Sequence, residues 1–226
     1  MTKTEDMLIS KVNTISDALY LSLKESIINL ELPPGEKLSE AQIAKLYGVS
    51  KAPVRSVLQR LHQEGYVQIK PQSGTVIAPL ISYEKARDIC QIRLLLEPYA
   101  ASIAARVITE EQKAPLYEFS KQCKNLKTCT KDRIVELHKI GDEKMHTLIW
   151  KLSGNQEIVS ILTGYHDEMK RMQITTAKYA ARIPASLKEM IEVNDALLAN
   201  DSERCKEKMH VHIANLLKAL ETIMEK

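Results

Sequence analysis

Apolar residues recur at helical spacing along most of the chain. In the segment 51–64, a stripe of four apolar residues stands at i, i+3, i+4 and i+7: Val54, Val57, Leu58 and Leu61. A short helix is expected before it, because Ser39 and Gln42 have capping-box spacing and Gly48 permits a tight left-handed turn. Weak alternation over 66–77 predicts a β-hairpin. Helix, turn, helix and hairpin together predict a winged helix-turn-helix.

The second helix of this motif carries side chains suited to DNA. Lys51, Arg55 and Gln59 are four residues apart and form one solvent-facing row. Arg can bond guanine bidentately, Gln can bond adenine, and Lys and Arg can hold phosphates. Ser50, which is expected to cap this helix, and Gly74 in the hairpin complete the predicted interface. The alternative is a pair of ordinary helices with a solvated basic face, but the hairpin and the Lys/Arg spacing favour DNA binding.

From Tyr83 onward the pattern predicts helices only. The first covers 83–108, and Pro98 is expected to kink or split it. The others are expected at about 109–126, 131–152, 156–180, 184–199 and 202–224. The predicted fold is therefore mostly α, with a winged helix-turn-helix domain (1–78), a linker (79–82) and an all-helical bundle of about six helices (83–226).

Composition agrees with a mostly helical protein of two domains. The 226 residues include 44% hydrophobic residues and only 7 Gly. The net charge is only +3, although six Lys and Arg stand against three Glu between Glu36 and Gly74. No C-x-x-C pair or metal-finger spacing occurs among the cysteines, so reduced thiols are expected at Cys90, Cys123, Cys129 and Cys205. No apolar run has the length of a membrane span, and we expect a cytoplasmic protein with no membrane partner.

The first domain resembles the DNA-binding domain of the GntR family of bacterial transcriptional regulators over about residues 15–78. The residues that keep the family spacing are Leu38, Glu40, Ala44, Gly48, Val49, Ser50, Pro53, Val54, Arg55, Leu61, Glu64 and Gly65. The resemblance implies that Ser50, Lys51 and Arg55 approach phosphates and bases. Two departures stand out: Ala41 replaces a frequent Arg linked to DNA contact, and Lys51 replaces an Arg. We therefore expect fewer base contacts than in relatives, because Lys lacks the bidentate fork of Arg.

The second domain resembles the effector-binding FCD domain of the FadR-like branch of that family, over about 82–220. The matching pieces are Arg93, Glu97 and Pro98, Asp142 and His146, the Ser-Gly-Asn at 153–155, and Met209 with His212. The resemblance implies a divalent metal such as Zn, Ni or Mn held by one Asp and three His, with a small carboxylate effector bound to it. Asp142, His146 and His212 match three of these ligands, whereas Met190 stands at the fourth position.

Three interpretations of these residues remain open. A metal binds through Asp142, His146 and His212; or the metal is lost and the histidines bond the effector directly; or the groups only satisfy one another in the core. His138 shares the helix face of Asp142 and is a candidate substitute ligand, whereas His166 and His210 lack matching spacing. Arg93 is a candidate clamp for an effector carboxylate, or else the partner of Glu97, and Arg171 is a weaker candidate for the same role.

The sequence thus predicts a homodimeric repressor that binds a palindromic double-stranded DNA operator and responds to a small carboxylate effector. One alternative is a metal-dependent enzyme in the helical bundle with an accessory DNA-binding head. No G-x-S-x-G or H-E-x-x-H motif occurs, and no unpaired carboxylate is placed as a general base, so an enzyme is not expected. A pure protein-interaction module is a further alternative, but it has no need of Lys51 and Arg55 at groove-reading spacing.

Overall fold

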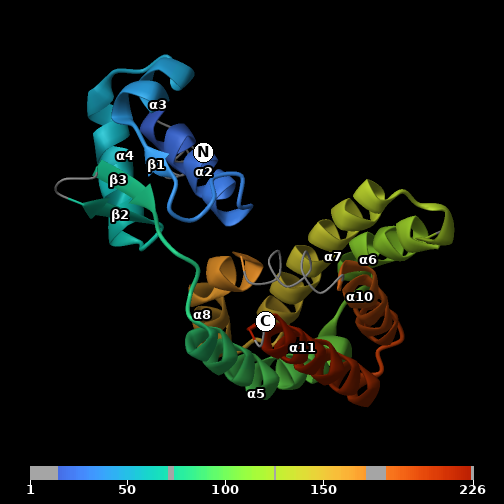
Figure 1. Ribbon diagram of the computed structural model, residues 1–226. Coiled ribbons are helices and arrows are strands. Elements are labelled where there is room, and N and C mark those ends of the chain that lie inside the picture. The colour runs from blue at the N-terminus through green and yellow to red at the C-terminus, as the bar shows by residue number, and fades with distance from the viewer. Residues whose placement is uncertain (1–14, 71–73, 125, 172–181, 225–226) are drawn as a thin grey trace, which may run out of the picture. The chain divides into compact units, whose positions relative to one another are not determined.

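The computed structural model describes residues 15–70, 74–124, 126–171 and 182–224, and the chain divides after Leu80 into two compact units (Figure 1). The elements of the first unit are α2 (Ile15–Ile28), β1 (Lys37–Leu38), α3 (Glu40–Tyr47), α4 (Lys51–Gln63), β2 (Val67–Lys70) and β3 (Gly74–Ile77). This order confirms the predicted winged helix-turn-helix.

The core of the first unit lies between α2, α3, α4 and one face of the sheet. It contains the whole predicted stripe of α4, namely Val54, Val57, Leu58 and Leu61. The turn between α3 and α4 is confirmed as well, because Gly48 has a left-handed φ of 64°. Ser50 is the N-cap residue of α4, as predicted, with an extended backbone, but its side chain makes no capping hydrogen bond.

The wing is a three-stranded antiparallel sheet in the order β1-β3-β2. The predicted hairpin is present, with Val67 opposite Ile77 and Lys70 opposite Gly74. The sequence did not indicate β1, which pairs with β3. The hairpin residues 71–73 lie outside the described residues.

The second unit is helical throughout its described part (Figure 1). Its labelled elements are α5 (Tyr83–Val107), α6 (Glu110–Cys123), the short 3-10 helix η1 (Leu126–Thr128), α7 (Lys131–Leu152), α8 (Gln156–Gly164), α10 (Ile183–Leu198) and α11 (Ser202–Met224). None of the described helices is both long and apolar enough to span a membrane.

Two expectations about these helices meet the structure differently. Helix α5 continues through Pro98 without a split, because a proline removes only one helical hydrogen bond and α5 packs along α11 with buried small residues such as Ala100 and Ala104. The kink at Pro98 stays a prediction. The helix expected over 156–180 ends at Gly164, where a turn at Tyr165 precedes a new helical stretch. Residues 172–180 of that expectation lie outside the described residues.

Candidate functional site

The predicted DNA-reading row is exposed on one face of α4. Lys51, Arg55 and Gln59 are all solvent-exposed, and Ser50 is exposed at the start of the helix. Gly74 opens β3 with a φ of +75°, a left-handed conformation that side chains rarely adopt. These residues are therefore accessible at the surface, and their contact with DNA stays a prediction.

A contact across the turn orients the central side chain of this row. The Nε atom of Arg55 donates to Oε1 of Glu40 at 3.1 Å, and its Nη2 atom donates to Oε2 at 3.0 Å. These hydrogen bonds lower the pKa of Glu40 and raise the pKa of Arg55. Sequence reasoning cited Glu40 only as part of the family motif and missed this role. Because a bidentate pair favours one plane for the guanidinium, Glu40 of α3 orients Arg55 at the surface of α4.

The second predicted cluster lies inside the helical unit. Nε2 of His146 is 3.5 Å from Oδ1 of Asp142 and 3.3 Å from Nε2 of His212, and the latter is 3.7 Å from the same Oδ1. Asp142 and His146 come from α7 and His212 from α11, and all three are buried. The structure thus brings together three residues that the sequence places up to 70 positions apart, and among the described residues they are the one group suited to a metal.

The distances within this triad fit a divalent ion. The centre of a triangle with 3.3–3.7 Å sides is about 2.0 Å from each corner, which is the usual length of a Zn–N or Zn–O bond. Oδ1 of Asp142 has no hydrogen-bond partner although it is buried. A buried carboxylate oxygen without a partner is costly, and a cation at this point would satisfy it.

Two further carboxylates hold the imidazole rings from behind. Nδ1 of His146 lies 2.5 Å from Oε2 of Glu97, and Nδ1 of His212 lies 3.0 Å from Oε2 of Glu189. A carboxylate accepts, so each Nδ1 carries the proton and each neutral ring turns a lone pair on Nε2 toward the triad. Two facing lone pairs need a cation or a proton between them. Carboxylates behind metal-binding histidines are the usual way of setting this tautomer.

In the absence of a metal, a proton on His146 takes that place. Burial opposes the charge on His146, but the carboxylates of Glu97 and Asp142 outweigh it and raise the pKa of His146 to about 9. Burial also opposes ionisation of Asp142, yet the neighbouring histidines hold its pKa well below its usual value. The triad is therefore built to hold positive charge, whether as a proton or as a metal ion.

Arg93 completes this buried network. Its side chain is 1% exposed, and its Nε atom donates to Oε1 of Glu97, which is the ion pair considered as an alternative to effector binding. Its Nη1 atom, however, is buried without a hydrogen-bond partner. The guanidinium is thus both structural and able to bond one more acceptor.

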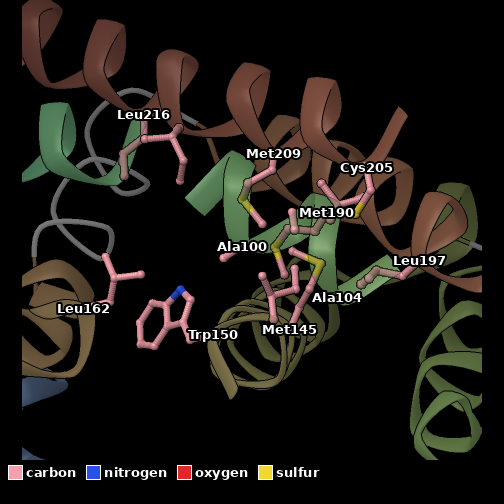
Figure 2. Packing of buried hydrophobic residues seen from close by; sticks show 14 of the residues in the cluster. Ala100, Ala104, Met145, Trp150, Leu162, Met190, Leu197, Cys205, Met209 and Leu216 are labelled. Carbon is pink, nitrogen blue, oxygen red and sulfur yellow. The ribbon is translucent and has the colours of Figure 1, made fainter. Parts of the chain in front are cut away.

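The other candidates have different surroundings. Met190 is fully buried in the hydrophobic cluster of the bundle, which also includes Met145 and Met209 (Figure 2). His138 is bonded through Nε2 to Oγ of Ser186 at 2.9 Å and does not join the triad. The ring of His166 meets Trp150 edge-on, and His210 is exposed. Arg171 is buried at the edge of the described residues, and its role stays a prediction.

Sequence reasoning missed the support given by Glu97 and Glu189. The sequence did mark Glu97, since it belongs to the motif that includes Arg93. Its spacing, however, predicts a pair with Arg93 and not a contact with His146, which is 49 positions away. Nothing in the sequence pointed to Glu189, because its contact with His212 depends on how α10 packs against α11.

Comparisons with known proteins agree with both halves of this description. Residues 15–77 match the model of "Bacterial regulatory proteins, gntR family", and residues 88–215 match the model of the FCD domain. The chain belongs to the GntR family, with an FCD domain as its second half.

Named relatives are transcriptional regulators. The HTH-type transcriptional regulator YdhC of Bacillus subtilis (strain 168) is 25% identical over 98% of this chain and 97% of its own length. The HTH-type transcriptional repressor RspR of Escherichia coli (strain K12) is 21% identical over 98% of this chain and 96% of its own length. This GntR chain is thus a transcriptional regulator by family.

Solved structures share the fold. McbR/YncC of E. coli superposes with a TM-score of 0.72 at 18% identity, covering 94% of this chain and 100% of the other. A GntR transcriptional regulator from Rhodococcus sp. RHA1 superposes with a TM-score of 0.75 at 16% identity, covering 93% and 99%. A winged helix-turn-helix unit followed by a helical unit is therefore a fold that solved structures share with this chain.

Proposed function

We propose that this GntR regulator is a homodimeric repressor whose hold on a palindromic operator is weakened when a small carboxylate binds at Asp142, His146 and His212. The observation that carries the proposal is the triad itself. Three ligand atoms converge inside the effector-type domain of a regulator, and carboxylates set both imidazole tautomers.

Operator recognition would use the exposed face of α4. Arg55, held by Glu40, is the side chain best placed to read a base, since a guanidinium fork bonds guanine bidentately. Lys51 and Ser50 at the helix start would hold phosphates, and Gln59 one turn beyond Arg55 would reach an adenine or the backbone. Gly74 lets the wing backbone approach the duplex closely.

Effector recognition would use the triad together with Arg93. A divalent ion such as Zn, Ni or Mn supplies Lewis acidity, which attracts a carboxylate oxygen. Asp142, His146 and His212 would hold it, while Glu97 and Glu189 fix the two rings. The unpartnered Nη1 of Arg93 would donate to an acceptor on the same ligand.

An apolar stripe on α5 supports the homodimer. Leu95 is 77% exposed and Tyr99 is 53% exposed, although both are large apolar side chains. The half-buried Ile92, Leu96 and Ile103 lie beside them at helical spacing. Contiguous apolar surface of this kind marks subunit contacts, and a palindromic operator needs two heads for useful affinity.

The test is a titration of a selected operator. The protein would first be used to select the duplexes that it binds from a random pool. Its affinity for the selected duplex would then be measured with and without metal, and with and without each member of a panel of mono-, di- and tricarboxylates. We expect one panel member to lower operator affinity at least tenfold in the metal-loaded protein. Elemental analysis should find about one metal per chain, and none in His146→Ala.

His210→Ala is the matched control, because His210 is exposed and makes no contact with the triad. It should keep both metal and response. A response to carboxylates that His146→Ala and His212→Ala leave intact would refute the effector site. A chain that selects no duplex at all would refute the regulator mechanism.

A further inference from the structure

The second unit contains a cavity that the triad does not use. It lies between α6 and α7 and has a volume of about 470 Å³, within the range of about 300–1,000 Å³ usual for small-molecule sites. Its walls are mostly apolar, with Leu116 and Phe119 from α6 and Met145 and Leu148 from α7. Asn194 of α10 also borders it.

The cavity and the triad lie on different sides of α7. The cavity is bordered by Ile140, Lys144, Thr147, Leu148 and Lys151, which form one stripe at helical spacing. Asp142 and His146 are two residues from Lys144 in either direction, and side chains two apart point about 160° from one another on a helix. Gly141 and Met145, which precede Asp142 and His146 in the sequence, also border the cavity, but no member of the triad lines it.

The polar group at this cavity is an unsatisfied acceptor. Nδ2 of Asn194 donates to the carbonyl of Leu116 at 3.3 Å and to Oγ of Ser120 at 2.6 Å. The carbonyl can only accept, so the amide orientation is settled and the other end is Oδ1. That oxygen has no hydrogen-bond partner, and Asn194 is fully buried. A donor arriving from the cavity would remove the cost of leaving it unpaired.

Charge at the rim favours an anion on the α7 side. Lys144 and Lys151 are exposed, and no ion pair forms to either among the described residues. The acidic side chain at the cavity is Glu118 on α6, whose Oε1 accepts from Gln122. The two lysines of α7 outnumber the single carboxylate of α6, so the rim of the cavity has a net positive charge.

We propose that this cavity is a second, metal-independent ligand site for a small aromatic carboxylate that carries an O–H or N–H donor. The ring fills the space between Phe119 and Leu148, the donor bonds Oδ1 of Asn194, and the carboxylate lies toward Lys144 and Lys151. The site goes beyond the proposed effector site, because it needs neither the triad nor a metal.

Three related probes test each part of the proposal in the full chain, kept metal-free with a chelator. 4-Hydroxyphenylacetate has both polar groups, phenylacetate lacks the donor, and tyrosol lacks the carboxylate. Calorimetry should show one 4-hydroxyphenylacetate per chain. Phenylacetate should bind about fivefold more weakly, which is the value of one hydrogen bond. Tyrosol should bind about two- to fivefold more weakly, as an exposed ion pair implies.

Variants then assign each difference to a residue. In Asn194→Leu the preference for 4-hydroxyphenylacetate over phenylacetate should vanish, and in Lys144→Gln/Lys151→Gln the preference over tyrosol should vanish. Lys139→Gln, an exposed change on the same helix outside the cavity, should keep both preferences. If circular dichroism shows that Asn194→Leu does not fold, the double variant Lys144→Gln/Lys151→Gln still tests the proposal.

Three results would overturn the proposal. The first is no binding of 4-hydroxyphenylacetate at millimolar concentration. The second is preferences that survive in the Asn194 and lysine variants. The third is binding that His146→Ala abolishes, which would place the ligand at the triad. His146→Ala that binds the probe normally would support a separate site even if the proposed effector site proves wrong.

Discussion

Replacing Glu97 with Gln tests the buried network that supports the triad. Glu97 is fully buried and bonds both Arg93 and His146. Gln keeps the shape but removes the negative charge, so the guanidinium of Arg93 is left buried without its counter-ion. Removing one partner of a buried ion pair usually costs about 3–5 kcal/mol of unfolding free energy. Because Gln can still accept one hydrogen bond, we expect the lower end of that range.

The single tryptophan of the chain allows this loss of unfolding free energy to be measured in the helical unit. Trp150 is buried in the helical domain, with its ring centroid 6.1 Å from that of His146. Urea unfolding followed by Trp150 fluorescence, in the presence of a chelator, reports the stability of this unit alone. A loss of about 3 kcal/mol corresponds to a melting temperature lower by on the order of 10 °C. Glu111→Gln, on the exposed surface of α6, is the control and should stay within about 0.5 kcal/mol.

The metal affinity of Glu97→Gln provides a second, independent test of the same network. The carboxylate of Glu97 fixes the tautomer of His146, and loss of such a support usually weakens metal binding about 10- to 100-fold. Competition with a chelating dye measures this directly. If Glu97→Gln were as stable as Glu111→Gln and bound metal as tightly as the parent, the electrostatic account of this network would be refuted.

Three further variants test other parts of the structure. In Gly141→Ala the new Cβ would lie 2.5 Å from a neighbouring ring, so calorimetric unfolding should show a loss of about 1–3 kcal/mol, whereas Gly164→Ala meets nothing within 4 Å and should not destabilise. In Glu40→Gln the orientation of Arg55 is released, and anisotropy titrations should show operator preference over random DNA falling by about two- to tenfold while non-specific affinity does not fall. Met190→His should destabilise the metal-free chain, because it buries an imidazole in an apolar cluster. It should raise metal affinity if position 190 supplies the fourth ligand, as the family resemblance implies, and equal metal content of parent and variant in elemental analysis would contradict this role.

Local patterns predicted the helices and the turn well, because they depend on neighbours in sequence. The stripe of Val54, Val57, Leu58 and Leu61 and the left-handed Gly48 follow from periodicity and turn chemistry alone. The break at Gly164 agrees with the poor helix propensity of glycine, which the prediction of one long helix overlooked. The continuous helix through Pro98 goes against local preference, and packing against α11, which a single sequence does not reveal, accounts for it.

The candidate metal site divides in the same way. The spacing of Asp142 and His146 places both on one helix face, so this half of the triad could be predicted from residues alone. His212 was found through the family resemblance, since 66 positions separate it from His146. Glu97 and Glu189 emerged only from the packed bundle. Their roles depend on atom positions within a few tenths of an ångström, which periodicity cannot supply.

In the proposed effector site, Met190 at the expected position of a fourth ligand would have a physical consequence for sensing. With Met190 buried among apolar side chains, the triad offers three donor atoms, and an ion held there keeps more positions for exogenous oxygen than one held by four. A carboxylate that fills such positions gains affinity from the ion, and the ion gains the same factor from the carboxylate, since coupling free energies are reciprocal. When the protein alone has a lower affinity for the ion, a larger part of the total binding free energy of the ion comes from the bound effector. A regulator of this design would respond to the metal and the carboxylate jointly, whereas one with four ligands would stay loaded and respond to the carboxylate alone.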